Sequence, residues 1–183
     1  AAGVQGRKCV VILEPDGLSV LDCLTTDQMI SRLVMINKAI DILKTAGVLV
    51  YVDCSEWVPV EKTMERLHLV NVRKASGISL NVSLSQSLTD CHAYAAQLTA
   101  LFGFNVNYVI DTSRNGAGPP LNNAWCNPPE LRVGQKPNTR TKVPLCNGYL
   151  WIKPPGESDG LCNGGPSAGA WWPEYALLLT SDV

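Results

Sequence analysis

The chain has 183 residues, of which 46% are hydrophobic and 17% charged, proportions typical of one globular domain with a substantial core. Fifteen basic and sixteen acidic side chains leave a formal net charge of −1, which predicts neither a nucleic-acid partner nor an anionic membrane surface. Its apolar runs are shorter than a bilayer span and no signal peptide opens it, so we expect a single domain over residues 1–183 without a membrane segment.

Short apolar runs alternate with longer amphipathic segments, which predicts strand-helix units and a parallel sheet, an α/β fold. The predicted strands are 9–13, 48–52, 78–82, 106–110 and 149–152. The predicted helices cover 25–46, a segment beginning near 59, 87–101 and 173–179. Thr25 and Gln28 form a candidate capping box for the first helix, and Gly47 and Gly103 are expected to end the first and third.

A long segment rich in Gly, Pro and Asn separates the last two predicted strands. It covers residues 112–148, and a second Gly-rich segment covers 154–169. Most connections in compact domains are only a few residues long, and longer ones are usually functional or disordered.

Each predicted strand is followed by polar residues. These are Glu14 and Asp16, Asp53, Asn81, Asp111, and Lys153 with Glu157 and Asp159. The carboxyl ends of parallel strands carry the ligand site in α/β folds, so these residues predict a cleft lined by carboxylates. Glycosidic bond hydrolysis requires two carboxyl groups with different pKa values. Any single one could equally cap a helix or pair with a base, and only the whole set favours a glycosidase.

Five tryptophans bear on the same question, because indole rings pack on the apolar faces of sugars. Trp57 and Trp125 lie outside any core periodicity and are predicted sugar platforms. Trp151 is placed in the fifth strand, and Trp171 and Trp172 precede the last helix; all three are expected to pack in the core.

Seven cysteines without any Cys-x-x-Cys spacing favour a secreted, extracellular protein with one to three disulfides and at least one thiol unpaired within the chain. No phosphate-binding or dinucleotide-binding loop is present, and His68 and His92 lack ligand spacing, so we expect no cofactor and no metal. The segment 165–169 matches G-x-S-x-G but follows no strand, which argues against a serine hydrolase.

Several segments resemble glycoside hydrolase family 6, the inverting cellobiohydrolases and endoglucanases that act on cellulose. They read Val11-Ile-Leu-Glu-Pro-Asp16, Leu80-Asn-Val-Ser83, Tyr108-Val-Ile-Asp-Thr-Ser-Arg-Asn-Gly116, Trp125-Cys-Asn-Pro-Pro129 and Leu150-Trp-Ile-Lys-Pro-Pro-Gly-Glu-Ser-Asp-Gly160. The resemblance implies a distorted parallel β/α barrel, TIM-like, with a substrate cleft across its carboxyl end, and a β-1,4-glucan or cello-oligosaccharide as ligand.

The resemblance also implies roles for individual residues. Asp159 matches the aspartate proposed as the base, and Asp16 matches the aspartate of the family's Glu-Pro-Asp. Substrate-binding positions are Trp125, Lys153, Glu157, Trp57, Asn81 and Arg114, and Cys126 is expected to form a disulfide with Cys162.

Two departures from the family pattern accompany the match. The family's first two barrel strands and its general acid have no counterpart, so we expect an incomplete barrel with weak or no catalysis. The family's Asp-Ala-Gly-His is here Asp53-Cys-Ser-Glu56, shortened before Trp57, and the usual aromatic after the family's Asn-Val-Ser-Asn is replaced in Leu84-Ser85. Glu14, Glu56 or Asp111 would be the substitute acids.

Three hypotheses follow from these observations. The first is a glucan hydrolase module, and the second is a noncatalytic glucan-binding remnant or decoy. The third is one part of a barrel that is completed by self-association or by another polypeptide, because an open sheet edge favours association.

Overall fold

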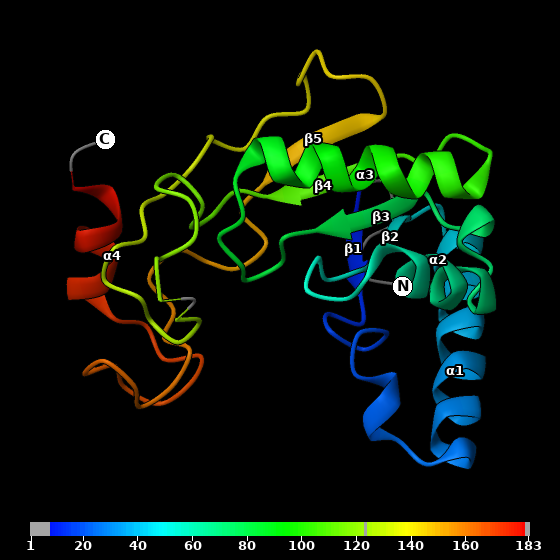
Figure 1. Ribbon diagram of the computed structural model, residues 1–183, viewed down its shortest axis with the longest axis horizontal. Coiled ribbons are helices and arrows are strands. Elements are labelled where there is room, and N and C mark those ends of the chain that lie inside the picture. Colours follow the sequence, from blue (N-terminus) through cyan, green and yellow to red (C-terminus); the bar gives the residue numbers. More distant parts are fainter. Residues whose placement is uncertain (1–7, 123, 182–183) are drawn as a thin grey trace.

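The computed structural model describes residues 8–122 and 124–181 and contains one curled, five-stranded parallel sheet (Figure 1). The strands are β1 (Val10–Leu13), β2 (Leu49–Asp53), β3 (Gly77–Leu80), β4 (Tyr108–Asp111) and β5 (Cys146–Leu150). Each strand pairs in parallel with the one before it, in the order β1-β2-β3-β4-β5. The prediction of a partial α/β barrel with five strands is therefore confirmed.

The helices begin and end close to the predicted residues. They are α1 (Thr26–Thr45), α2 (Val60–Leu69), α3 (Leu88–Phe102) and α4 (Pro173–Thr180), with short 3₁₀ turns at Leu21–Cys23 and Val72–Lys74. Thr25 and Gln28 form the expected capping box. Gly103 ends α3 in the left-handed conformation that glycine adopts without strain.

The main core lies between the sheet and helices α1, α2 and α3. Ile36 and Ile40 of α1 are buried in it, together with Leu67 of α2 and Leu98 of α3. A second, smaller core joins Leu131 and Val133 of the long loop to Tyr175 and Leu179 of α4. We call this second part, residues 112–145 with 151–181, the loop lobe; Figure 1 shows α4 set well apart from α1 and α2.

The structure corrects three predictions. β5 begins at Cys146 and ends at Leu150, because Cys146 and Gly148 pair with Tyr108 and Val109 of β4 while Asn147 between them lies at an irregularity in the register. Trp151 therefore follows the strand and packs on the second core. Trp171 is 60% exposed and not a core residue, whereas Trp172 stacks on Tyr175.

β3 also ends two residues early, at Leu80. The backbone of Asn81 is left-handed, with φ of 63°, and that of Ser83 has φ of 60°. Extended pairing cannot continue through such angles, so the chain turns away and β3 is followed by a loop on the carboxyl edge of the sheet.

Candidate active site

Asp159 lies at the centre of a polar cluster built from loops that follow β3, β4 and β5. Its Oδ2 accepts hydrogen bonds from Nη1 of Arg114 at 2.6 Å and from the backbone N–H of Asn127 at 3.0 Å. Its Oδ1 lies 3.3 Å from Nζ of Lys153. The guanidinium of Arg114 also donates to the carbonyl of Ser83. Two cations and one N–H group thus surround a nearly buried carboxylate.

These neighbours keep Asp159 ionised. Burial by itself raises the pKa of this carboxyl, but the Arg114 guanidinium, the Asn127 N–H and the Lys153 ammonium group outweigh burial, and the pKa lies below its ordinary value. An ionised carboxylate beside a substrate cleft can accept a proton from water, which is what the base of an inverting glycosidase does.

Asp111 occupies the end of β4 and has a structural role. Its Oδ1 accepts the N–H groups of Ser113 and Ile152, at 2.9 and 3.3 Å, and its Oδ2 those of Ser83 and Lys153, both at 3.0 Å. Asp111 therefore holds the neighbouring loops in place, with each of its oxygens occupied by two backbone N–H groups.

Two further carboxyl groups, Asp53 and Glu56, lie at the end of β2 and just after it, and their pKa values are raised. Asp53 accepts the N–H of Asp16 at 2.9 Å and the hydroxyl of Ser79 at 3.0 Å, and Oε2 of Glu56 accepts the N–H of Asn81 at 2.9 Å. Oε1 of Glu56 is buried without a nitrogen or oxygen partner in the described part of the chain. Burial raises the pKa of both carboxyls to about 7, so near neutral pH each holds a proton about half the time.

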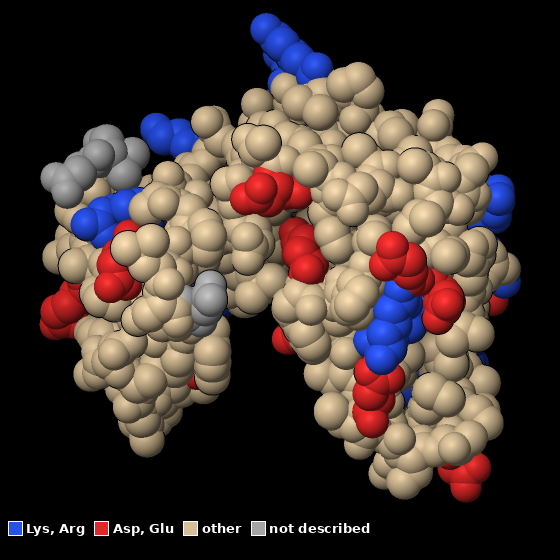
Figure 2. Space-filling view, in the orientation of Figure 1, with Lys and Arg blue, Asp and Glu red and all other residues tan. Residues whose placement is uncertain are grey.

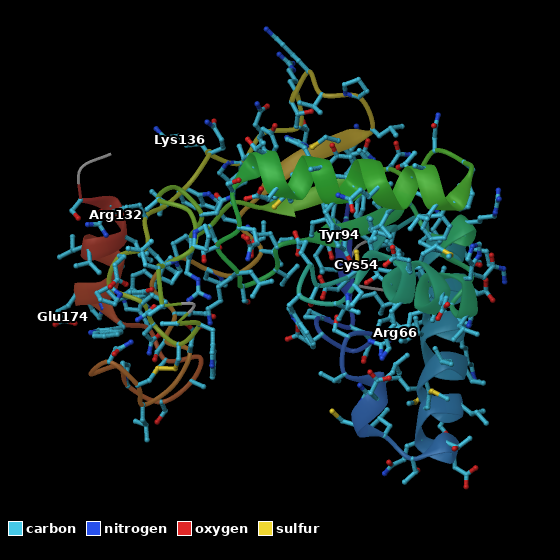
Figure 3. The ribbon with its side chains drawn as sticks, viewed as in Figure 1. Cys54, Arg66, Tyr94, Arg132, Lys136 and Glu174 are labelled. Atoms are coloured by element: carbon cyan, nitrogen blue, oxygen red, sulfur yellow. A yellow bond between two sulfur atoms is a disulfide. The ribbon has the colours of Figure 1, made fainter. Side chains whose placement is uncertain are left out.

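Asp16 lies at the other end of the row of strand-end residues, in the loop after β1. Its Oδ1 accepts the hydroxyl of Ser55 at 2.9 Å. Further along this loop, Nη1 of the buried Arg66 of α2 donates to the carbonyls of Leu18 and Ser19, each at 2.9 Å (Figure 3). The loop that carries Asp16 is therefore fixed to β2 and α2.

A cavity of about 260 Å³ lies beside the Asp159 cluster. Trp57 and Trp125 line it and are 55% and 71% exposed, so their indole rings are available to a ligand. Arg114, residues 83–86 and Pro119 also line it, so the loops after β2 and β3 and the loop lobe all contribute to its walls. Figure 2 shows a hollow between the loop lobe and the part that carries α1, and a surface of mostly uncharged side chains.

A comparison with known protein families shows which family this chain belongs to. The family described as "Glycosyl hydrolases family 6" matches residues 1–183, the whole chain. The chain belongs to glycosyl hydrolase family 6.

Other family 6 proteins agree with this assignment. Endoglucanase A from Cellulomonas fimi is 40% identical over 186 residues, which cover 100% of this chain and 40% of that protein. Endoglucanase 1 from Streptomyces halstedii is 37% identical over 98% of this chain and 57% of its own length. The chain thus spans about half the length of these relatives.

The solved structure of the endoglucanase Cel6 from Mycobacterium tuberculosis, in complex with methyl-cellobiosyl-4-deoxy-4-thio-β-D-cellobioside, superposes with a TM-score of 0.89 at 41% identity. The match covers 98% of this chain and 63% of that one. Endoglucanase CEL6B from Humicola insolens matches with a TM-score of 0.79 at 27% identity, over 97% and 62% of the two chains. The half-barrel is thus of the family 6 cellulase type.

The predicted site residues of this family 6 chain fall into separate groups. Arg114 and Lys153 each contact Asp159, and Trp57 and Trp125 share a cavity with Arg114. Asp16 belongs to the Asp53 group. Direct contact of these residues with a sugar stays a prediction.

Three of the predicted substrate-binding residues, Asn81, Arg114 and Glu157, are buried or bound to other parts of the chain. Asn81 is fully buried, donates to the carbonyl of Asp111 and accepts from the N–H of Gln86, so it shapes the wall behind the cavity. Arg114 is 1% exposed. Glu157 forms an isolated antiparallel backbone bridge with Trp171.

Cys126 and Cys162 form the disulfide that the resemblance implies, within the loop lobe (Figure 3). The other five cysteines, all in the described part of the chain, have free thiols. No helix among the described residues has the length and apolar character that crossing a membrane requires.

Sequence reasoning missed Asn127 and Arg66. Asn127 contacts Asp159 directly, and its place between Cys126 and Pro128 in a matched motif was the available signal. Arg66 is in the middle of α2 and gives no sequence signal, because its partners lie 47 and 48 residues away.

Proposed function

We propose that this chain is a glucan-binding part of a secreted family 6 hydrolase that acts on β-1,4-glucan. The observation that carries the proposal is the cavity that places the exposed indoles of Trp57 and Trp125 beside Arg114, the partner of Asp159. Indole faces bind the apolar faces of pyranose rings, and a net charge of −1 suits a neutral ligand. The names of the relatives, endoglucanases, support the same substrate class.

In this proposal Asp159 acts as the base and takes a proton from the water that attacks the sugar. The acid that protonates the leaving oxygen has no assigned residue. Both oxygens of Asp111 are occupied by backbone N–H groups, which leaves neither free to face a leaving oxygen. Burial raises the pKa of Glu56 to about 7, but its Oε1 is buried and its Oε2 is bonded to Asn81. We therefore expect weak hydrolysis by the chain alone, because general acid catalysis contributes on the order of 10²- to 10⁴-fold.

The test measures binding and hydrolysis in the same preparation. Cellohexaose should quench the tryptophan fluorescence of the chain, and Trp125→Ala should weaken binding about tenfold or more, as expected when one stacking contact worth about 1.4 kcal/mol is lost. Trp171→Ala is the matched control, since Trp171 is equally exposed but lies outside the cavity.

Release of reducing sugar from soluble β-1,4-glucan is measured alongside. Release that disappears in Asp159→Asn supports hydrolysis, and release that also disappears in a separate Glu56→Gln variant would assign Glu56 as the substitute acid. Binding without any release supports the second candidate, a noncatalytic glucan-binding remnant, which the solvent-shielded Glu56 favours. Absence of both binding and release would contradict the proposal.

We further propose that additional strand-helix structure covers the free edge of β1. Among the described residues, β1 pairs only with β2. Val10 of β1 is 46% exposed, and Val34 and Met35 of α1 are 60% and 62% exposed. A cavity of about 140 Å³ lies between Leu13 and Met35. An open strand edge beside apolar helix residues favours pairing with another strand, supplied by a second copy or by another polypeptide.

Sedimentation velocity across a concentration series tests the second copy. We expect the wild-type chain to form dimers as its concentration rises and Met35→Glu to remain monomeric, because a charge is costly in an apolar interface. Glu65→Lys on α2 serves as a control for altered surface charge. A wild-type chain that stays monomeric throughout would exclude self-association.

A further inference from the structure

Asn127 joins the loop that carries Trp125 to the loop that carries Asp159. Its Oδ1 accepts the backbone N–H of Asp159 at 2.7 Å, while its own N–H donates to Oδ2 of Asp159 at 3.0 Å. Its Nδ2 reaches the carbonyls of Gly160 and Cys162, at 2.9 and 3.1 Å. Asn127 is 1% exposed, so all these bonds form away from water.

The reciprocal pair fixes Asp159 in two ways. The side-chain Oδ1 of Asn127 holds the backbone of Asp159, and the backbone N–H of Asn127 holds the carboxylate and favours its ionised form. The side-chain bond therefore fixes the position from which the carboxylate meets the Asn127 N–H, Arg114 and Lys153. Arg114 and Lys153 supply charge, but neither contacts the backbone of Asp159 among the interactions of the described residues.

Gly165 shows that this part of the fold is built around the Asn127 amide. A Cβ at position 165 would lie 2.4 Å from Nδ2 of Asn127 and 2.7 Å from the carbonyl of Gly160. Gly165 is not in the left-handed conformation, so the requirement for glycine is one of space. Any larger residue has to displace the amide of Asn127.

We propose that Asn127 is a positioning residue whose side chain sets the position and orientation of Asp159. Its importance for catalysis rests on the proposed function, whereas its effect on Asp159 does not. The nearby disulfide, Cys126 to Cys162, joins the same two loops but makes no contact with the Asp159 carboxylate that would replace this role.

The experiment follows the carboxyl carbon of Asp159 by ¹³C NMR through a pH titration of the full chain, with the signal assigned by its loss in Asp159→Asn. Asn127→Gly removes the side chain and tolerates the left-handed backbone, φ 48°. The variant keeps the backbone N–H that donates to Oδ2 of Asp159 and loses the Oδ1 and Nδ2 bonds that hold the backbone of the Asp159 loop. We expect the pKa of Asp159 to rise by about half a pH unit, because the loosened carboxylate interacts less closely with Arg114 and Lys153. Asn127→Asp should raise it further, because it adds a negative charge.

Gly165→Ala should reproduce the direction of the Asn127→Gly shift, although residue 165 does not touch Asp159. The matched control is Asn163→Gly, which removes bonds from Nδ2 of Asn163 to the carbonyls of Cys126 and Asn127 in the same pair of loops. This control should leave the pKa of Asp159 unchanged. Near-ultraviolet circular dichroism establishes that each variant retains its tertiary packing.

A pKa of Asp159 that is the same in wild type and Asn127→Gly would overturn the inference, and so would an equal shift in Asn163→Gly. Where sugar release is measurable, the acidic limb of its pH profile should move upward with the pKa. A chain that binds no glucan at all but shows the NMR shift would contradict the proposed function and leave the positioning role intact.

Discussion

The free energy of unfolding should be higher at pH 5 than at pH 8, by an amount on the order of 4 kcal/mol. Asp53 and Glu56 have pKa values raised by burial to about 7, from ordinary values of 3.8 and 4.5. Between these limits the unfolded chain loses its protons while the folded chain keeps them. Stability is therefore fully present below the unfolded pKa and is lost as pH rises through 7.

Urea unfolding at a series of pH values measures this effect. Asp53→Asn and Glu56→Gln should each reduce the slope, because an amide has no proton to lose in this range. Burial lowers the pKa of His92, so His92 reduces the free energy of unfolding as pH falls below 6.5. The pKa of Asp159 is also lowered, so its contribution to the free energy of unfolding is lost only below about pH 4. Stability that rises from pH 5 to pH 8 would contradict the prediction.

Arg114→Met should destabilise the fold by about 3–5 kcal/mol, which is the usual cost of breaking a buried ion pair. Arg114 is 1% exposed, and its loss leaves the Asp159 carboxylate with Lys153 as its remaining cation. The carbonyl of Ser83 also loses its Arg114 donor. The thermal midpoint should fall by roughly 10 °C for a domain of this size, as measured by calorimetry.

Lys74→Met is the control for this prediction. Lys74 lies 2.9 Å from Asp41, a similar distance, but its side chain is 48% exposed. Exposed pairs contribute roughly 0–1 kcal/mol, so the midpoint should hardly move. Arg114→Lys should recover only part of the loss, because Lys lacks the planar fork that reaches both Asp159 and Ser83. Equal effects of Arg114→Met and Lys74→Met would contradict the role given to burial.

The sequence predicted the elements whose signals are local. Thr25 with Gln28 and the glycine at 103 are sufficient to place the ends of α1 and α3, because capping depends on residues within one helical turn. β5 begins three residues before the predicted start, because its pairing with β4 accommodates Gly148 in the ladder and Asn147 at a register irregularity, and both residue types have low strand propensity.

The site was less predictable, because its contacts join distant segments. The bond from Arg114 to Asp159 spans 45 residues, and that from Asn127 spans 32. Strand-end position predicted that these residues lie on one edge of the sheet, but not which carboxylate binds which cation. Nor did it predict that Asp111 would be saturated with N–H donors while Glu56 holds a proton.

The order of the strands in the sheet matters for how the chain is synthesised. Every strand pairs with the one that precedes it in the sequence, so β1 to β5 can join the sheet one after another as they leave the ribosome. The loop lobe closes last, because Cys126 can form its disulfide only after Cys162 has been synthesised, and Asn127 can bind Asp159 only after Asp159 has been synthesised. A nascent chain stalled before residue 150 should hence already protect the amides of β2 and β3 from hydrogen exchange, while the base of the proposed reaction has yet to be made.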